Sequence, residues 1–125
     1  MNAGARTRLL WLGWWGIWAL ITLPWDGLEA EPQWQRVGWG LFEFSGRRRA
    51  VLDAGLNLLI FVPFGLLGGH SKWRTGVTVG LAALVSFATE ALQLFTVSRH
   101  PSTTDLLMNI TGAAVGNLIV ALRRR

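Results

Sequence analysis

Four long apolar blocks, separated by shorter polar or charged connections, constrain this chain more than any other feature. They cover residues 9–25, 50–69, 75–97 and 103–122. Each is close to the ~17 to 25 residues that an α-helix needs to cross the hydrocarbon core of a bilayer. A soluble domain of this size disperses its apolar residues instead. The pattern therefore predicts an all-α fold, an integral membrane bundle of four transmembrane helices forming one domain over residues 1–125.

Composition excludes several other classes of protein. Apolar residues make up 51% of the chain, and the mean hydropathy is +0.36. The chain has no cysteine and two histidines, so a disulfide framework, a thiolate site or a His-rich metal site is not expected. We predict no metal and no cofactor. The net charge of +5 comes largely from arginines at the block ends, which favours membrane lipids over nucleic acid as partners.

The first block allows two interpretations. Arg6 and Arg8 precede it, and a basic segment before an apolar run is typical of a signal peptide as well as of a spanning helix. Cleavage at Ala30 would place the bulky Leu28 where a small residue is preferred. The tryptophans of the block are typical of residues near a membrane interface. We predict a retained helix, with a signal peptide as the alternative.

The connection over residues 26–49 contains an amphipathic stretch, "WQRVGWGLFEF". Its apolar side chains recur at helical spacing: Trp34, Val37, Leu41 and Phe42. This spacing predicts a short interfacial helix lying on the membrane surface. Arg47, Arg48 and Arg49 close the connection, and such a triplet is typical of a headgroup anchor.

Lysine and arginine counts predict the orientation of the helices. With four spans, the N-terminus, the connection at 70–74 and the C-terminus share one side of the membrane. That side holds seven basic residues: Arg6, Arg8, Lys72, Arg74, Arg123, Arg124 and Arg125. The other side holds five: Arg36, Arg47, Arg48, Arg49 and Arg99. The excess predicts a multi-pass protein of the cell membrane with both termini in the cytoplasm.

Polar residues in the last three blocks are predicted to meet near one membrane face. Short connections make these blocks antiparallel neighbours, so the start of block two, the end of block three and the start of block four lie together. The residues concerned are Asp53, Asn57, Glu90, Gln93, Arg99, Asp105 and Asn109. Within each block they are three or four apart and share one side of the helix. Because charged groups in a span face a bundle interior or a wet cavity, we predict a polar ligand-binding site between three helices.

Plainer roles fit some of these residues as well. Asn57, Gln93 and Asn109 also suit simple hydrogen bonding between helices. Asp53 and Asp105 lie near helix starts, where a carboxylate complements the helix dipole. Thr104 or Asp105 also suits the N-cap of the last helix.

Four further residues are predicted to shape the bundle. Pro63 and Gly65 interrupt the second block and predict a bend in its helix. Gly112 and Gly116 have the spacing that permits close contact between helices. Gly112 follows Asn109 by three residues, so the glycine side of this helix adjoins its polar side.

Three ordered motifs resemble the VanZ-like family of small bacterial membrane proteins. The first is "NLLIFVPFGLL", carried by Asn57, Phe61, Pro63 and Gly65, with Asp53 four residues ahead; the second is Glu90, Gln93 and Arg99; the third is Asp105, Asn109, Gly112 and Gly116. The resemblance is strongest over residues 50–120. It implies an association with resistance to the glycopeptide teicoplanin, and it brings no established catalytic residue with it.

Three functions follow as hypotheses. The polar site binds a lipid-linked cell-wall precursor or a glycopeptide, with arginines meeting phosphates or carboxylates. Alternatively, the protein is a membrane enzyme acting on a lipid-linked envelope substrate, using Glu90 as general acid or base and the carboxylates of Asp53 and Asp105, although no familiar catalytic motif is present. In the third hypothesis the chain is a structural subunit or homo-oligomer that associates through its glycine face.

Overall fold

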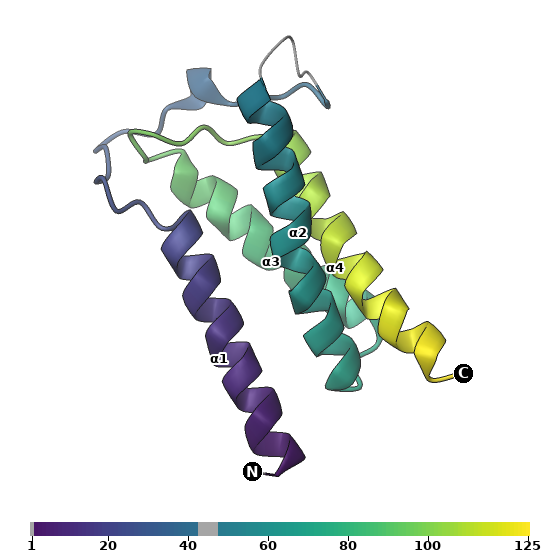
Figure 1. Cartoon of the computed structure of the whole chain (residues 1–125). Helices are drawn as coiled ribbons and strands as arrows, with labels where there is room; N and C mark the ends of the chain where they lie inside the picture. Colours follow the sequence, from purple (N-terminus) through teal and green to yellow (C-terminus); the bar gives the residue numbers. More distant parts are fainter. Residues whose placement is uncertain (1, 43–47) are drawn as a thin grey trace.

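The computed structural model describes residues 2–42 and 48–125 of the chain. These ranges contain four α-helices, α1 (Ala3–Thr22), α2 (Arg48–His70), α3 (Thr75–Gln93) and α4 (Thr103–Arg123), and one 3₁₀ turn, η1 (Trp34–Arg36) (Figure 1). The all-α prediction is therefore confirmed. α2, α3 and α4 are long and apolar enough to cross a membrane. α1 is 20 residues long, and its crossing of the membrane stays a prediction.

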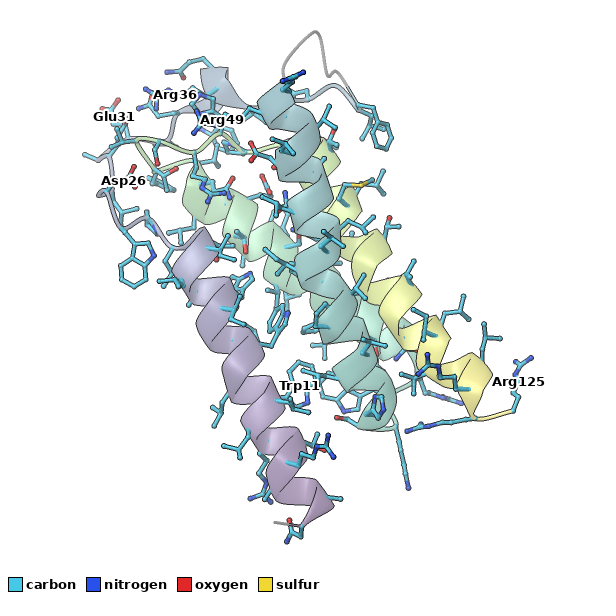
Figure 2. The ribbon with its side chains drawn as sticks, viewed as in Figure 1. Trp11, Asp26, Glu31, Arg36, Arg49 and Arg125 are labelled. Atoms are coloured by element: carbon cyan, nitrogen blue, oxygen red, sulfur yellow. The ribbon has the colours of Figure 1, made fainter. Side chains whose placement is uncertain are left out.

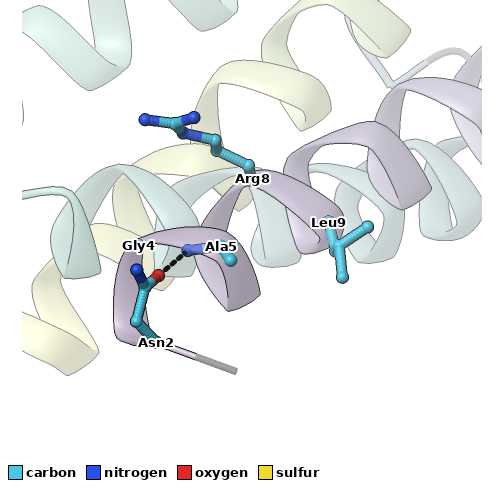
Figure 3. A pocket seen from close by; sticks show the side chains of 5 residues that line it. All are labelled: Asn2, Gly4, Ala5, Arg8 and Leu9. Carbon is cyan, nitrogen blue, oxygen red and sulfur yellow. Dashed lines mark hydrogen bonds between the residues drawn. The ribbon is translucent and has the colours of Figure 1, made fainter.

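Two helix boundaries differ from those predicted. α1 begins at Ala3, earlier than the expected residue 9, because the Asn2 side chain accepts a hydrogen bond of 2.8 Å from the Ala5 amide and caps the helix (Figure 3). α3 ends at Gln93 and does not reach residue 97. The hydroxyl of buried Thr96 donates to the Gln93 carbonyl at 2.9 Å, which turns the chain out of the helix.

α2 and α4 form the most extensive interface of the bundle. They run in the same direction, and α3 runs antiparallel to both (Figure 1). A Cβ atom added at Gly112 would overlap the Leu58 carbonyl of α2, and one added at Gly116 would overlap the Val62 carbonyl. A Cβ at Gly65 would likewise overlap the carbonyl of Ala113. Glycine at these positions therefore lets the two helix backbones touch.

Tryptophans attach α1 to the rest of the bundle. Trp14 is buried, with its ring centroid 5.5 Å from that of Phe61 and 4.8 Å from that of Phe64. Its indole Nε1 donates to the Ile60 carbonyl at 2.8 Å. Trp11 lies between α1 and α2 in Figure 2, and its Nε1 donates to the Ser71 hydroxyl at 3.3 Å. Trp14 of α1 thus belongs to the core of the bundle, and retention of this helix stays a prediction.

α3 carries mostly polar residues on its buried side, and all three candidate spanning helices carry large apolar residues on the outside. The buried side of α3 consists largely of Thr78, Ala82, Ser86, Thr89 and Gln93. Large apolar side chains point outward instead, among them Leu52, Leu56, Leu59, Leu84, Phe87, Leu118 and Leu122. This distribution suits a lipid environment. There, apolar side chains are stable on the outer surface, whereas polar side chains require hydrogen-bond partners inside the bundle.

The connection after α1 forms a cap segment (residues 23–42) over one end of the bundle. The predicted interfacial helix is wrong: only Trp34–Arg36 form a single 3₁₀ turn. Backbone amides of the cap segment bond to the α3–α4 connection instead, from Glu29 to the Phe95 carbonyl at 2.6 Å and from Gln33 to the Leu94 carbonyl at 2.8 Å. Within the predicted stretch, the Gly38 amide donates to the Pro101 carbonyl at 2.8 Å and the Gly38 carbonyl accepts from the Thr103 amide at 3.0 Å, so neither group is available to a helix. The last residues of the predicted helix and Arg47 lie outside the described residues.

Pro63 lies on the exposed side of α2, which continues as one α-helix from Arg48 to His70. A proline removes one backbone donor from a helix interior without having to end it. The bend predicted at this position stays a prediction.

Candidate functional site

Two hydrogen-bonded pairs define how α3 and α4 face each other. The Asn109 Nδ2 donates to the Ser86 Oγ at 2.7 Å, and the Asn117 Nδ2 donates to the Thr78 Oγ1 at 2.9 Å. Both helices advance by eight residues between the two pairs, in opposite directions, so the register is constant. One turn beyond Ser86 lies Glu90, and one turn before Asn109 lies Asp105. The register therefore brings these two carboxyl groups to the same level of the bundle.

Glu90 joins the end of α3 to the beginning of α4. Its Oε2 accepts a hydrogen bond of 2.6 Å from the Ser102 amide. Ser102 is the N-cap residue of α4, so the predicted N-caps, Thr104 and Asp105, are wrong. Asp105 lies in the first turn of the helix. Both carboxyl groups thus lie at the positive end of the α4 dipole, which favours negative charge.

Asp105 also connects to α2. The side chain of half-buried Asn57 lies close enough to the Asp105 carboxyl group to interact with it. The charges of Asp53 and Arg99 act on the same carboxyl group. Asp53 is exposed, one turn before Asn57. The structure therefore brings residues of α2, α3 and α4 together at the end of the bundle that the cap segment covers.

Arg99 lies on the exposed rim of this cluster. Its Nη2 donates to the Ile21 carbonyl at 2.6 Å, which ties the α3–α4 connection to the last turn of α1. Its charge acts on both Glu90 and Asp105. Arg99 thus combines a structural bond to α1 with an electrostatic effect on the acids.

Asn109 lies one turn deeper in the bundle than Asp105, whereas Gln93 is the last residue of α3. Asn109 is 4% exposed, and its Oδ1 has no hydrogen-bond partner in the part of the chain that the structure describes. Gln93 is also buried, and its backbone carbonyl accepts the hydroxyl of Thr96. We call Asn57, Glu90, Asp105 and Asn109, with Asp53 and Arg99 at the rim, the polar site.

Sequence reasoning missed several contacts. The Ser102 amide and the Ile21 carbonyl are backbone groups, for which the side-chain pattern holds no signal. Asn117 was also missed, although it follows Asn109 by eight residues, the spacing that returns to the same side of a helix. Its Oδ1 accepts from the Thr75 hydroxyl at 2.8 Å, so both ends of its amide are bonded.

Charged residues surround the polar site at the cap end. Arg36 and Arg49 lie at this end and Arg125 at the other (Figure 2). Arg36 bonds to the Glu29 carboxylate at 3.2 Å and to the Val97 carbonyl at 3.3 Å. The Phe42 amide donates to the Thr104 hydroxyl at 2.9 Å, which holds the end of the cap segment against α4.

Two surface hollows lie away from the polar site. One is at the start of α1, beside Asn2 and Arg8 (Figure 3), and the other is an apolar groove between α1, α2 and α3 next to Trp11 and Trp73. Across residues 2–42 and 48–125, no group of three or more histidine, cysteine, aspartate or glutamate residues is arranged to hold a metal ion.

Comparison with known proteins extends the match beyond the three motifs. No curated protein and no solved structure matches the chain significantly. The model of the VanZ/LLP1 family matches residues 11–124. This match includes α1 from Trp11 onward and the cap segment, which the motifs between residues 50 and 120 did not reach. Since it covers nearly the whole chain, the protein belongs to the VanZ/LLP1 family.

Proposed function

We propose that this VanZ/LLP1 membrane protein binds the polar head of an envelope amphiphile in its polar site and thereby contributes to glycopeptide (teicoplanin) resistance. The observation that carries the proposal is the meeting of Asn57, Glu90 and Asp105, from three helices, beneath the cap segment. Acids at this depth in a membrane bundle are costly and are typical of functional sites.

The proposed location is the cell membrane, with both termini in the cytoplasm and the polar site toward the outside. Seven lysines and arginines at the end holding the termini, against five at the cap end, support this orientation. In this orientation the polar site meets the leaflet where lipid-linked cell-wall precursors and glycopeptides come together.

The proposed ligand is a lipid-linked cell-wall precursor or a glycopeptide. Arg48 and Arg49 begin α2 at the cap end and are exposed, so their guanidinium groups are free to reach phosphates or carboxylates near the membrane surface. Arg47, predicted to share this role, lies outside the described residues.

Teicoplanin susceptibility tests this function. We expect cells carrying the wild-type protein to survive higher concentrations than cells carrying Glu90→Gln or Arg99→Ala at equal protein levels. Asn117→Ala is the matched control, because it alters a buried polar residue of α4 far from the polar site. If both site variants protect as well as the wild type, the proposal is wrong.

A membrane enzyme remains the second candidate, because Glu90 and Asp105 lie at one level and paired carboxyls suit general acid–base chemistry. Incubation of the purified protein with a lipid-linked precursor, followed by mass spectrometry, tests this. Conversion of the precursor by the wild-type protein but not by Glu90→Gln would support an enzyme. A precursor left unchanged by the wild-type protein would count against one.

The glycine face of α4 is occupied within the bundle. Gly112 and Gly116 already pack against α2 of the same chain. A homo-oligomer would therefore have to use another surface of the bundle.

A further inference from the structure

The two buried asparagines of α4 differ in one respect. Asn117 uses both ends of its amide, accepting from Thr75 and donating to Thr78. Asn109 donates to Ser86, but its Oδ1 is buried with no partner among residues 2–42 and 48–125. A buried carbonyl oxygen without a hydrogen bond costs free energy, so a donor from outside the chain would relieve that cost.

Helix geometry places the Asn109 side chain next to the polar site. Side chains on an α-helix lean toward its N-terminus. Asn109 therefore leans toward the turn that holds Asp105, which is level with Glu90. Its amide nitrogen is bonded to Ser86, and its oxygen has no partner among the described residues. Asn109 thus lies one helical turn below Asp105 and carries the unbonded acceptor at that level.

The groups that converge here are acceptors. The Glu90 and Asp105 carboxyls and the Asn109 oxygen accept hydrogen bonds, and Asp53 adds a third acid at the rim. Arg99 is the cation whose charge acts on these acids, and its Nη2 is bonded to the Ile21 carbonyl. The polar site thus holds three carboxyl groups and one guanidinium, so acidic groups outnumber basic groups within it. A ligand that supplies both donors and positive charge is complementary to it.

We propose that the polar site receives a primary ammonium group, held by the carboxylates of Glu90 and Asp105 with the Asn109 Oδ1 beneath it. This inference rests on the proposed function and specifies its ligand class. A primary ammonium carries three N–H donors, one for each of these acceptors. A trimethylammonium carries the same charge and no N–H donor. The ammonium comes either from a lipid headgroup or from a soluble amine, and the experiment separates these sources.

Binding of short-chain phospholipids to the full chain in detergent tests the inference. The probes are an ethanolamine phospholipid, the matching choline and glycerol phospholipids, and free ethanolamine, with retention followed by native mass spectrometry. We expect the ethanolamine lipid to bind about tenfold more tightly than the other two lipids, because only it supplies charged N–H donors. Equal binding of free ethanolamine would identify a soluble amine as the source.

Three variants locate the binding site. Glu90→Gln and Asn109→Leu should each reduce binding of the ethanolamine lipid about tenfold, because each removes an acceptor. Asn117→Leu is the matched control, and its binding should equal that of the wild type. Glu90→Gln preserves size and shape, so a loss of binding by this variant is not explained by misfolding.

The inference is overturned if the three lipids bind equally, or if Glu90→Gln and Asn109→Leu bind the ethanolamine lipid as the wild type does. Neither result decides the proposed function, which depends on teicoplanin susceptibility. A protein whose Glu90→Gln variant loses resistance while all three lipids bind equally would keep its proposed function with a different ligand.

Discussion

Asn109 and Asn117 show how one residue type serves two purposes on the same side of one helix. Asn117 joins α4 to two threonines near the start of α3, and every polar end of its side chain is bonded. Asn109 joins α4 to Ser86 and leaves one acceptor unbonded. The first arrangement stabilises the bundle, whereas the second trades stability for an acceptor within the polar site.

This difference predicts that the same substitution costs more stability at Asn117 than at Asn109. Asn117→Leu should lower the free energy of unfolding by about 1 to 2 kcal/mol, because it removes two interhelical hydrogen bonds. Asn109→Leu should cost about 0.5 kcal/mol or less, because removing the unbonded oxygen offsets the bond lost to Ser86. Thermal or denaturant unfolding of both variants in detergent checks this. A larger loss for Asn109→Leu than for Asn117→Leu would contradict it.

Gly116 is one of the residues where added volume should be poorly tolerated. A Cβ there would overlap the Val62 carbonyl and crowd the Leu66 amide, both parts of the α2 backbone that cannot rotate away. Gly116→Ala should therefore destabilise the bundle by about 1 to 3 kcal/mol, the usual cost of overpacking.

Gly80→Ala is the matched control for that substitution. Gly80 lies in the middle of α3, and no atom comes within 4 Å of a Cβ built there. Unfolding of the two variants in the same detergent should show a loss for Gly116→Ala alone. Equal stability of the two variants would mean that α2 and α4 are not in backbone contact.

At the scale of the elements, α1 depends on aromatic contacts. The other three helices pack through small residues and buried polar groups, whereas α1 inserts Trp14 between Phe61 and Phe64. The tryptophans of α1 are therefore not all membrane-interface residues, because Trp14 lies in the core. The family match over residues 11–124 includes this helix, as its place in the fold requires.

The indole N–H of Trp14 should contribute to the docking of α1. Trp14→Phe keeps an aromatic ring but removes the donor to the Ile60 carbonyl. We expect a loss of about 1 kcal/mol or more in the free energy of unfolding, the worth of one hydrogen bond in a site without water. Trp15→Phe, at an exposed position of the same helix, should change stability less. Equal losses would show that the bond does not hold α1.

The cap segment shows where local pattern and tertiary structure disagree. Apolar residues at helical spacing predicted a helix within residues 34–44, yet the described part of this stretch forms one 3₁₀ turn, an isolated bridge at Gly38 and a turn. Gly38 bonds through its amide to the Pro101 carbonyl at 2.8 Å. Because that partner is more than sixty residues away in sequence, the local spacing of apolar residues cannot predict this bond.

At the scale of the whole molecule, the bundle has two chemically distinct ends. The cap segment and the polar site lie at one end, and both termini lie at the other (Figure 1). The natural chain has no cysteine, so single cysteines report on each end without background. Glu31 and Arg125 are exposed at opposite ends and suit this purpose (Figure 2).

We expect a membrane-impermeant thiol reagent to label Glu31→Cys on intact cells and Arg125→Cys only after the membrane is permeabilised. The expectation follows from the excess of basic residues at the end that holds the termini. Labelling of Arg125→Cys alone on intact cells would reverse the orientation and place the polar site toward the cytoplasm.

The sequence by itself determined the helical membrane architecture and the position of the polar residues along the length of the bundle. The lengths of the apolar blocks set the number of helices, and short connections set their antiparallel order. The positions of Asn57, Glu90 and Asp105 within their blocks then placed these residues near one end. These are local properties, since they depend on composition and spacing within about twenty residues.

Only the tertiary structure decided which groups touch. It directed Arg99 to the Ile21 carbonyl, placed the Ser102 amide on Glu90 and left the Asn109 oxygen unbonded while bonding both ends of Asn117. It also buried the glycines of α4 against α2. Such contacts join residues distant in sequence, often through backbone groups that every residue possesses. Their choice depends on how whole helices pack, which no local pattern of side chains encodes.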